Sequence, residues 1–136
     1  MFGQEIRVPH DTMPYQIKEE PAFIRITFSG TIKPRELQAA LKQLEALEAA
    51  SVIMPPRLLD LSKVEQSAVT AEDVQAVAVK RKTRRFPNAF RSAIVAPLPA
   101  QYGYARMFQS LTDHPDIKIQ VFDTVAEATA WLTAKG

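Results

Sequence analysis

The sequence predicts one α/β domain built on a single mixed sheet of about five strands, with helices covering the sheet. Short apolar or alternating runs, typical of strands, are separated by longer stretches with helical periodicity, in the order β-β-α-β-α-β-α-β-α. Helical crossovers of this kind imply parallel pairing of the later strands, whereas the first two strands form a hairpin. With 136 residues, 46% of them hydrophobic, the chain can bury one core. We assign residues 15–136 to this domain and residues 1–14 to an N-terminal arm or an extra edge strand.

The first third of the domain is predicted to contain a hairpin and a helix. Apolar and polar residues alternate over residues 15–19 and again over 22–28, and we expect Gly30 to end the second strand. Pro34 suits the first turn of a helix, which then runs to about Ala50. Helical spacing predicts the buried positions of this helix to be Leu37, Leu41, Leu44 and either Leu47 or Glu48.

The middle of the chain is predicted to form a buried strand and a second helix. Residues 57–61 are an apolar run, followed by a turn at Ser62-Lys63. Thr70 precedes acidic residues and is expected to cap the helix, which ends before Pro87-Asn88. The predicted inner face of this helix consists of Val74, Val77 and Ala78.

The last third is predicted to contain two strands, each followed by a helix. Residues 92–96 are a short apolar run expected in the centre of the sheet, and residues 99–112 form the third helix. Residues 117–122 alternate again, and Thr124 with Glu127 has the capping-box form that opens a final helix. The predicted buried residues of the third helix include Met107, Phe108 and Leu111.

Composition excludes several classes of function. The chain has no cysteine, so disulfides, thiolate nucleophiles and cysteine zinc sites are absent, which fits a cytoplasmic protein. No run of apolar residues is long enough for a transmembrane segment. The net charge of +2 argues against nucleic-acid binding, and aromatic residues are not interleaved with the basic ones as a stacking surface would require.

Positive charge is concentrated near the end of the second predicted helix. Basic residues at the last turn of a helix complement its dipole, so a solvated helix end is the first interpretation. Arg81 and Arg85 continue the inner-face spacing, and we expect their stems to lie over the edge of the core with their heads in water. The alternative is a surface for an anionic lipid, a phosphorylated or acidic ligand, or an acidic protein, formed by Lys80, Arg81, Arg84 and Arg85.

Catalytic and cofactor motifs are not recognisable. The only histidines are His10 and His114, and His114 is predicted in a surface loop at the N-terminal edge of the parallel strands. His10 with Asp11 supplies too few ligands for a metal site. The glycines are scattered, so no phosphate-binding loop is present. We therefore predict no catalytic residue, no metal and no cofactor.

Several segments together resemble the SpoIIAA-like, STAS-type family over about residues 15–134. The most characteristic is the final strand and helix, where Phe122-Asp123 leads into an alanine-rich helix with Trp131-Leu132. The resemblance implies a mixed sheet backed by helices and a regulatory or binding role without an established reaction; some relatives are likened to lipid-binding domains. The other segments that carry it are Ser29-Gly30-Thr31, Leu59-Asp60-Leu61-Ser62 and Ala93-Ile94-Val95-Ala96.

The chain departs from the family at the phosphorylated serine of the bacterial anti-sigma factor antagonists. In those proteins an Asp-Ser-Ser-Gly segment follows the strand, whereas here Ala68 and Val69 occupy the corresponding positions. The resemblance therefore implies that the phosphoserine switch is missing. We interpret Thr70 as a helix cap rather than as its replacement.

Polar and aromatic residues are predicted to gather at the C-terminal edge of the strands, where open α/β sheets usually bind ligands. They could line a partly apolar pocket. Alternatively, the aspartates cap turns, the tyrosines pack on the core and the arginine pairs with a neighbouring acid. The candidate ligand-binding residues are Asp60, Ser62, Tyr102, Tyr104, Arg106, Phe122 and Asp123.

These observations favour a non-enzymatic regulatory or ligand-binding domain. Its partner is expected to be a small apolar or anionic, lipid-like ligand, or a protein. Self-association through the hairpin edge or a helix face, as a two-fold dimer, is a further possibility. The enzymatic alternative uses Asp60, Asp123, Tyr104 and Arg106, and it requires these four side chains to converge on one cavity.

Overall fold

The computed structural model describes residues 14–135, so His10 and nearly all of the predicted N-terminal arm lie outside the described residues. The predicted element order is confirmed. The strands are β1 (Tyr15–Glu19), β2 (Ile24–Ile32), β3 (Arg57–Ser67), β4 (Phe90–Val95) and β5 (Ile117–Phe122). The helices are α1 (Pro34–Ala49), α2 (Ala71–Thr83), α3 (Pro99–Thr112) and α4 (Val125–Thr133).

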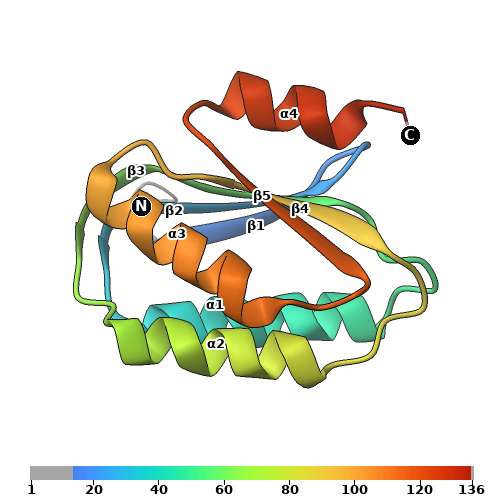
Figure 1. The fold of residues 1–136 in the computed structure, drawn as a ribbon, viewed down its shortest axis with the longest axis horizontal. Helices are drawn as coiled ribbons and strands as arrows, with labels where there is room; N and C mark the ends of the chain where they lie inside the picture. Colours follow the sequence, from blue (N-terminus) through green and yellow to red (C-terminus); the bar gives the residue numbers. More distant parts are fainter. Residues whose placement is uncertain (1–13, 136) are drawn as a thin grey trace, which may run out of the picture.

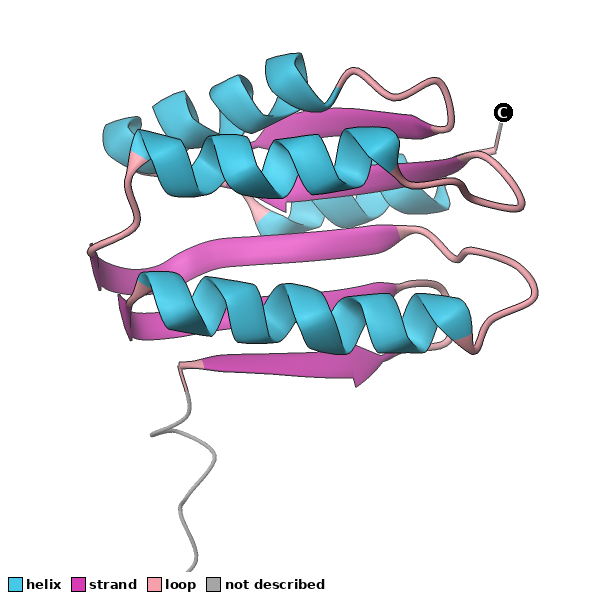
Figure 2. Ribbon diagram, turned by 90° about the horizontal axis from the view of Figure 1, so that it is seen from below, coloured by secondary structure: helices cyan, strands magenta, loops and turns pink. Residues whose placement is uncertain are grey.

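The five strands form one mixed sheet in the order β1-β2-β3-β4-β5. β1 pairs with β2 in antiparallel orientation, and the other three pairs are parallel. Helices α1, α2 and α3 cover one face of the sheet, and α4 lies alone on the other (Figures 1 and 2). The chain therefore has two unequal layers of helix around its sheet.

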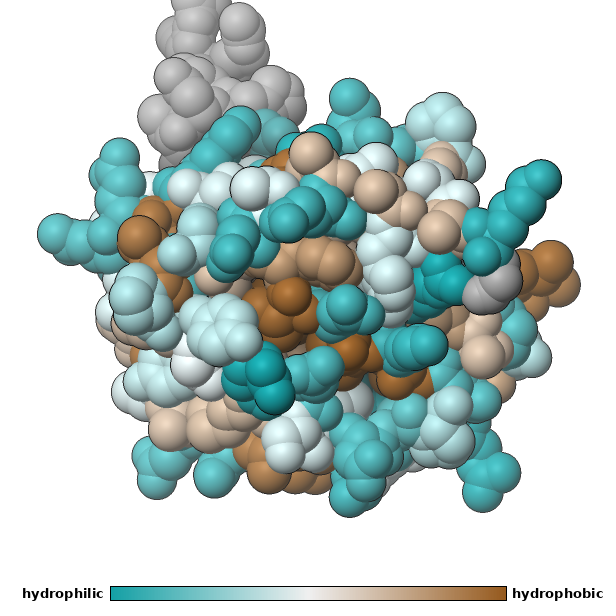
Figure 3. All heavy atoms as spheres, turned by 45° about the horizontal axis from the view of Figure 1, so that its top comes forward, coloured by the Kyte–Doolittle hydropathy of each residue, from teal (hydrophilic) through white to brown (hydrophobic). Residues whose placement is uncertain are grey.

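Side-chain alternation along the strands divides the core between these two faces. On the side of α1, Ile24, Ile26 and Phe28 of β2 pack with Leu44. On the side of α4, Leu58 of β3 packs with Ala128 and Leu132. Figure 3, which looks obliquely onto the α4 side, shows mainly polar side chains with a small apolar area near the middle.

Strand β3 does not turn at Ser62-Lys63 as predicted but continues to Ser67. A β-bulge occupies this position, because Thr27 pairs with Asp60 whereas Ser29 pairs with Lys63. The Asp60 carboxylate explains the bulge: its Oδ1 accepts the Ser62 backbone N–H at 2.9 Å and the Ser62 hydroxyl at 2.6 Å. The extra residue reverses the alternation, so that Val64 reaches the side of α1 and packs in the cluster of Ile32 and Leu44.

Strand β2 likewise does not end at Gly30 but continues to Ile32. Gly30 has a φ of 67°, a left-handed conformation that is inexpensive for a residue without Cβ. The register between β2 and β3 shifts again directly after this residue. Gly30 therefore lies beside a second bulge, whose extra residue is on β3, and not at the end of β2.

The helix caps were predicted more accurately than the helix ends. The side chain of Thr70 accepts the Asp73 N–H, and that of Thr124 accepts the Glu127 N–H, so both predicted caps are confirmed. Helix α2, however, ends at Thr83, before the predicted stop at Pro87-Asn88. Leu111, predicted to be buried, is 40% exposed on the outer side of α3.

Candidate functional site

A cavity of about 410 Å³ lies between the sheet and helices α1–α3, toward the C-terminal ends of the strands. We call it the outer cavity. Leu98 and Tyr104 of α3 line it and are 51% and 38% exposed, so it opens to solvent beside the start of α3. Most of its wall is apolar, and its polar lining comes from Glu65, Gln66, Ser67, Gln101 and Tyr104.

A second, smaller cavity of about 100 Å³ lies deeper between the same layers, and we call it the inner cavity. Its wall is apolar except for two arginines, Arg57 and Arg81, and Ser92. Four side chains line both cavities, so the two spaces are adjacent; they are Phe28, Leu37, Leu59 and Ile94.

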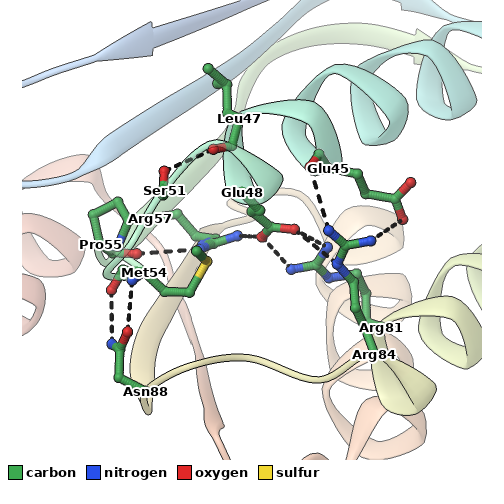
Figure 4. Close-up of polar contacts among 10 residues, drawn as sticks. All are labelled: Glu45, Leu47, Glu48, Ser51, Met54, Pro55, Arg57, Arg81, Arg84 and Asn88. Carbon is green, nitrogen blue, oxygen red and sulfur yellow. Dashed lines mark hydrogen bonds and ion pairs between the residues drawn. The ribbon is translucent and has the colours of Figure 1, made fainter.

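The two arginines belong to a buried ion cluster centred on Glu48 of α1 (Figure 4). Arg81 of α2 donates two hydrogen bonds to the Glu48 carboxylate, at 2.9 and 2.6 Å. Arg57 of β3 donates to the same carboxylate and also to the Pro55 carbonyl. Arg84 reaches Glu48 at 3.4 Å from the half-buried rim. One carboxylate thus joins the first helix, the second helix and the central strand.

The cluster is buried to an extent that is unusual for charged groups. Glu48, Arg57 and Arg81 are only 4%, 3% and 4% exposed. The guanidinium of Arg57 also lies 4.1 Å above the centre of the Phe90 ring. Its Nε is nevertheless buried without a hydrogen-bond partner in the described part of the chain.

The pKa values of Glu48 and Arg57 are shifted by burial and by the neighbouring charges. Burial alone raises the pKa of Glu48, but the hydrogen bond from Arg81 and the charges of Arg57 and Arg81 outweigh it, so the pKa lies below 4.5. Burial lowers the pKa of Arg57, and the attraction of Glu48 offsets this only in part. Glu48 is therefore ionised at neutral pH.

This shift predicts a pH dependence of stability. Because the pKa of Glu48 is lower in the folded than in the unfolded chain, its ionisation stabilises the fold above about pH 4.5, and this contribution is lost as the pH falls through the folded-state value. Urea unfolding measured between about pH 7 and about pH 3 should show the stability difference between the wild type and Glu48→Gln shrinking toward the acid end. A difference that stayed constant over this range would contradict the assignment.

The structure places the predicted ligand residue Asp60 inside the sheet and not at an open site. Asp60 is 1% exposed and has the same orientation as Leu58, toward α4. Besides holding Ser62, its carboxylate lies 3.5 Å from the Arg25 guanidinium. Asp60 and Ser62 are thus brought together by the β-bulge. They lie on the face of the sheet away from both cavities.

The other five predicted ligand residues are divided between the two faces of the sheet. Tyr104 lines the outer cavity. Tyr102 and Arg106, also on α3, are exposed and contact each other, with the arginine donating to the tyrosine hydroxyl at 3.0 Å. Phe122 packs against Trp131 of α4 on the opposite side of the sheet, and Asp123 is exposed in the following loop. The seven residues do not form one pocket.

The predicted anionic-partner surface is also divided by the structure. Lys80 and Arg85 are exposed, and Lys80 donates to Gln38 at 3.4 Å. Arg84 is half-buried between Glu48 and Glu45. The expectation that the head of Arg81 stays in water is wrong, because the whole residue is buried on Glu48.

His114 lies in the loop between α3 and β5, as predicted, and is half-buried there. Its Nδ1 accepts the Asp116 N–H, so the Nε2–H donates to the Arg84 carbonyl at 2.7 Å. Within residues 14–135, no group of three metal-ligating side chains is close enough to hold an ion. None of the helices in that range is long and apolar enough to cross a membrane.

The chain matches no family model, and no curated protein is similar to it in sequence. Two solved structures have a similar arrangement of helices and strands. An uncharacterized DUF3478-family protein with a SpoIIAA-like fold from Shewanella loihica PV-4 is 17% identical, with a TM-score of 0.59 over 87% of this chain and 91% of its own. An anti-sigma factor antagonist from Mycobacterium paratuberculosis is 16% identical, with a TM-score of 0.58 over 93% and 98%.

The topology and these comparisons together define the class of protein. Residues 14–135 form a mixed-sheet α/β fold with three helices on one face of the sheet and one on the other (Figure 1). More specifically, it has a SpoIIAA-like fold, which confirms the resemblance inferred from the sequence. At these identities the likeness establishes the fold, and the function has to be argued from the site.

Proposed function

We propose that this chain is a non-enzymatic binding domain whose outer cavity takes a small apolar or lipid-like molecule. The observation that carries the proposal is a cavity of about 410 Å³ with a mainly apolar wall and a mouth open to solvent. This volume falls within the usual range for small-molecule sites, about 300–1,000 Å³. A ligand with an apolar surface would displace water from this mainly apolar wall, which the hydrophobic effect favours.

The fold supports a role in binding more than one in catalysis. One protein with a similar structure is an anti-sigma factor antagonist. The enzymatic alternative requires Asp60, Asp123, Tyr104 and Arg106 to converge. Asp60 faces α4, whereas Tyr104 and Arg106 are on α3, on the opposite side of the sheet (Figure 1).

Filling the cavity should remove the binding of apolar ligands without unfolding the protein. Ala105 of α3 is 4% exposed and lines the outer cavity, so Ala105→Leu places added carbon atoms inside it. We expect this change to weaken binding of decan-1-ol by about tenfold or more, equivalent to about 1.4 kcal/mol. Isothermal titration calorimetry measures the affinity, and native mass spectrometry of gently purified protein shows whether a ligand is already bound.

The matched control is Ala76→Leu, which adds the same atoms on the exposed face of α2. This variant should bind decan-1-ol as the wild type does. The proposal is wrong if the purified wild type carries no extra mass and also does not bind decan-1-ol. Unchanged binding by the Ala105→Leu protein would place the ligand elsewhere and contradict the assignment to this cavity.

A further inference from the structure

The charges around the inner cavity identify the class of ligand more closely. The buried part of the ion cluster has two guanidiniums, Arg57 and Arg81, and one carboxylate, Glu48, with each side chain at most 5% exposed. Arg84 lies at the rim, where it reaches Glu48 at 3.4 Å and Glu45 at 3.9 Å, and the Arg84 and Glu45 side chains are 31% and 27% exposed, so these two rim charges offset each other. One positive charge therefore remains uncompensated in the interior.

An uncompensated buried charge is unfavourable, and proteins usually pair such groups. The hydrogen-bonding of Arg57 indicates where a partner is missing. Its two terminal nitrogens donate to Glu48 and Pro55, whereas the buried Nε–H has no acceptor within residues 14–135. Both arginines line the inner cavity, so an anion placed there would meet the excess charge.

The surroundings of the arginines specify what this anion is attached to. Apart from the two guanidiniums and Ser92, the inner cavity is lined by apolar side chains. It adjoins the outer cavity, where Glu65 is the only charged lining residue among the described residues, 14–135. Taken together, the two adjacent cavities are lined by cations at the inner end, by apolar side chains between, and by polar and acidic side chains toward the mouth.

We infer that the ligand is an unbranched monocarboxylic acid of fatty-acid type, bound with its carboxylate inward. The carboxylate lies beside Arg57 and Arg81 and accepts the Nε–H of Arg57. The alkyl chain passes Leu37 and Leu59, which line both cavities, and ends in the outer cavity. A single negative charge balances the buried cluster. This inference rests on the proposed function, because it requires that the outer cavity is a ligand site.

The test compares ligands of equal chain length in calorimetric titrations. Decanoate should bind the wild type about tenfold or more tightly than decan-1-ol, which has the same chain without the charge. Sodium acetate, a carboxylate without a chain, should bind far more weakly than decanoate. Equal affinity for decanoate and decan-1-ol would overturn the carboxylate assignment but leave the proposed function intact. Binding of neither would refute both.

A variant then assigns the carboxylate to Arg57. Arg57→Met leaves Glu48 and Arg81 as a balanced pair, so the fold is expected to survive, which circular dichroism checks. The preference for decanoate over decan-1-ol should disappear in this protein. The matched control Arg84→Met removes a cation of the same cluster that does not line either cavity, and it should keep the preference. A preference retained in Arg57→Met, or acetate binding as tightly as decanoate, would contradict the inference.

Discussion

Replacement of Glu48 by glutamine is expected to lower the free energy of unfolding by about 3–5 kcal/mol, the usual effect of removing one partner of a buried ion pair while the other stays buried. The glutamine removes the one anion within residues 14–135 that pairs with Arg57 and Arg81, and leaves two buried guanidiniums without this counter-charge. Because Glu48 joins α1 to both α2 and β3, the loss should affect the whole cooperative unit. Urea unfolding at neutral pH measures it.

Two controls separate the buried charge from a general effect of removing acids. Glu45 lies about one turn before Glu48 on the same helix, is partly exposed and lies 3.9 Å from Arg84. Glu45→Gln should therefore lower the free energy of unfolding by less than about 1 kcal/mol. Arg57→Met leaves one carboxylate with one guanidinium and should cost clearly less than Glu48→Gln. If Glu45→Gln and Glu48→Gln were equally destabilising, the cluster would not be the centre of the interaction.

Much of the fold could be predicted because local signals and the final packing agree. Pro34 opens α1, and the threonine caps at Thr70 and Thr124 open α2 and α4, as expected from capping chemistry. Helical periodicity placed the buried face of α1 correctly. It left the last position open between Leu47 and Glu48, and Glu48 is the buried one.

The ion cluster could not be predicted, because its partners are distant in sequence. Arg57 is 9 residues and Arg81 is 33 residues from Glu48. The periodicity of α2 did place Arg81 on the inner face, but a long basic side chain there ordinarily extends to water. Only the position of α1 beside α2 shows that a buried carboxylate meets it.

The candidate site was only partly predictable for a similar reason. The C-terminal edge of the sheet was the right region for a cavity, and Tyr104 does line it. Most of its other lining residues are apolar side chains of strands β2–β4 and helices α1–α3, which in the sequence look like ordinary core residues. The β-bulge at Ser62 also decides which residues of β3 reach the cavity, since it turns Val64 toward the helices.

The bulge itself should depend on the Asp60 carboxylate. Asp60→Ala removes the acceptor for the Ser62 N–H and hydroxyl and leaves Arg25 without this partner, at a site only 1% exposed. We expect a loss of about 2–4 kcal/mol, from an unsatisfied N–H inside the sheet together with the space left by the side chain. Thermal and urea unfolding, followed by circular dichroism, measure this loss.

Asp60→Asn distinguishes the bulge from the ion pair with Arg25. The asparagine oxygen can still accept the Ser62 N–H, whereas the charge that faces Arg25 at 3.5 Å is removed. This variant should lose less than about 1 kcal/mol, since Arg25 is 30% exposed and such pairs contribute little. A loss in Asp60→Asn as large as in Asp60→Ala would mean that the charge, and not the acceptor for Ser62, stabilises this part of β3. Retained stability in both would show that the bulge forms without Asp60.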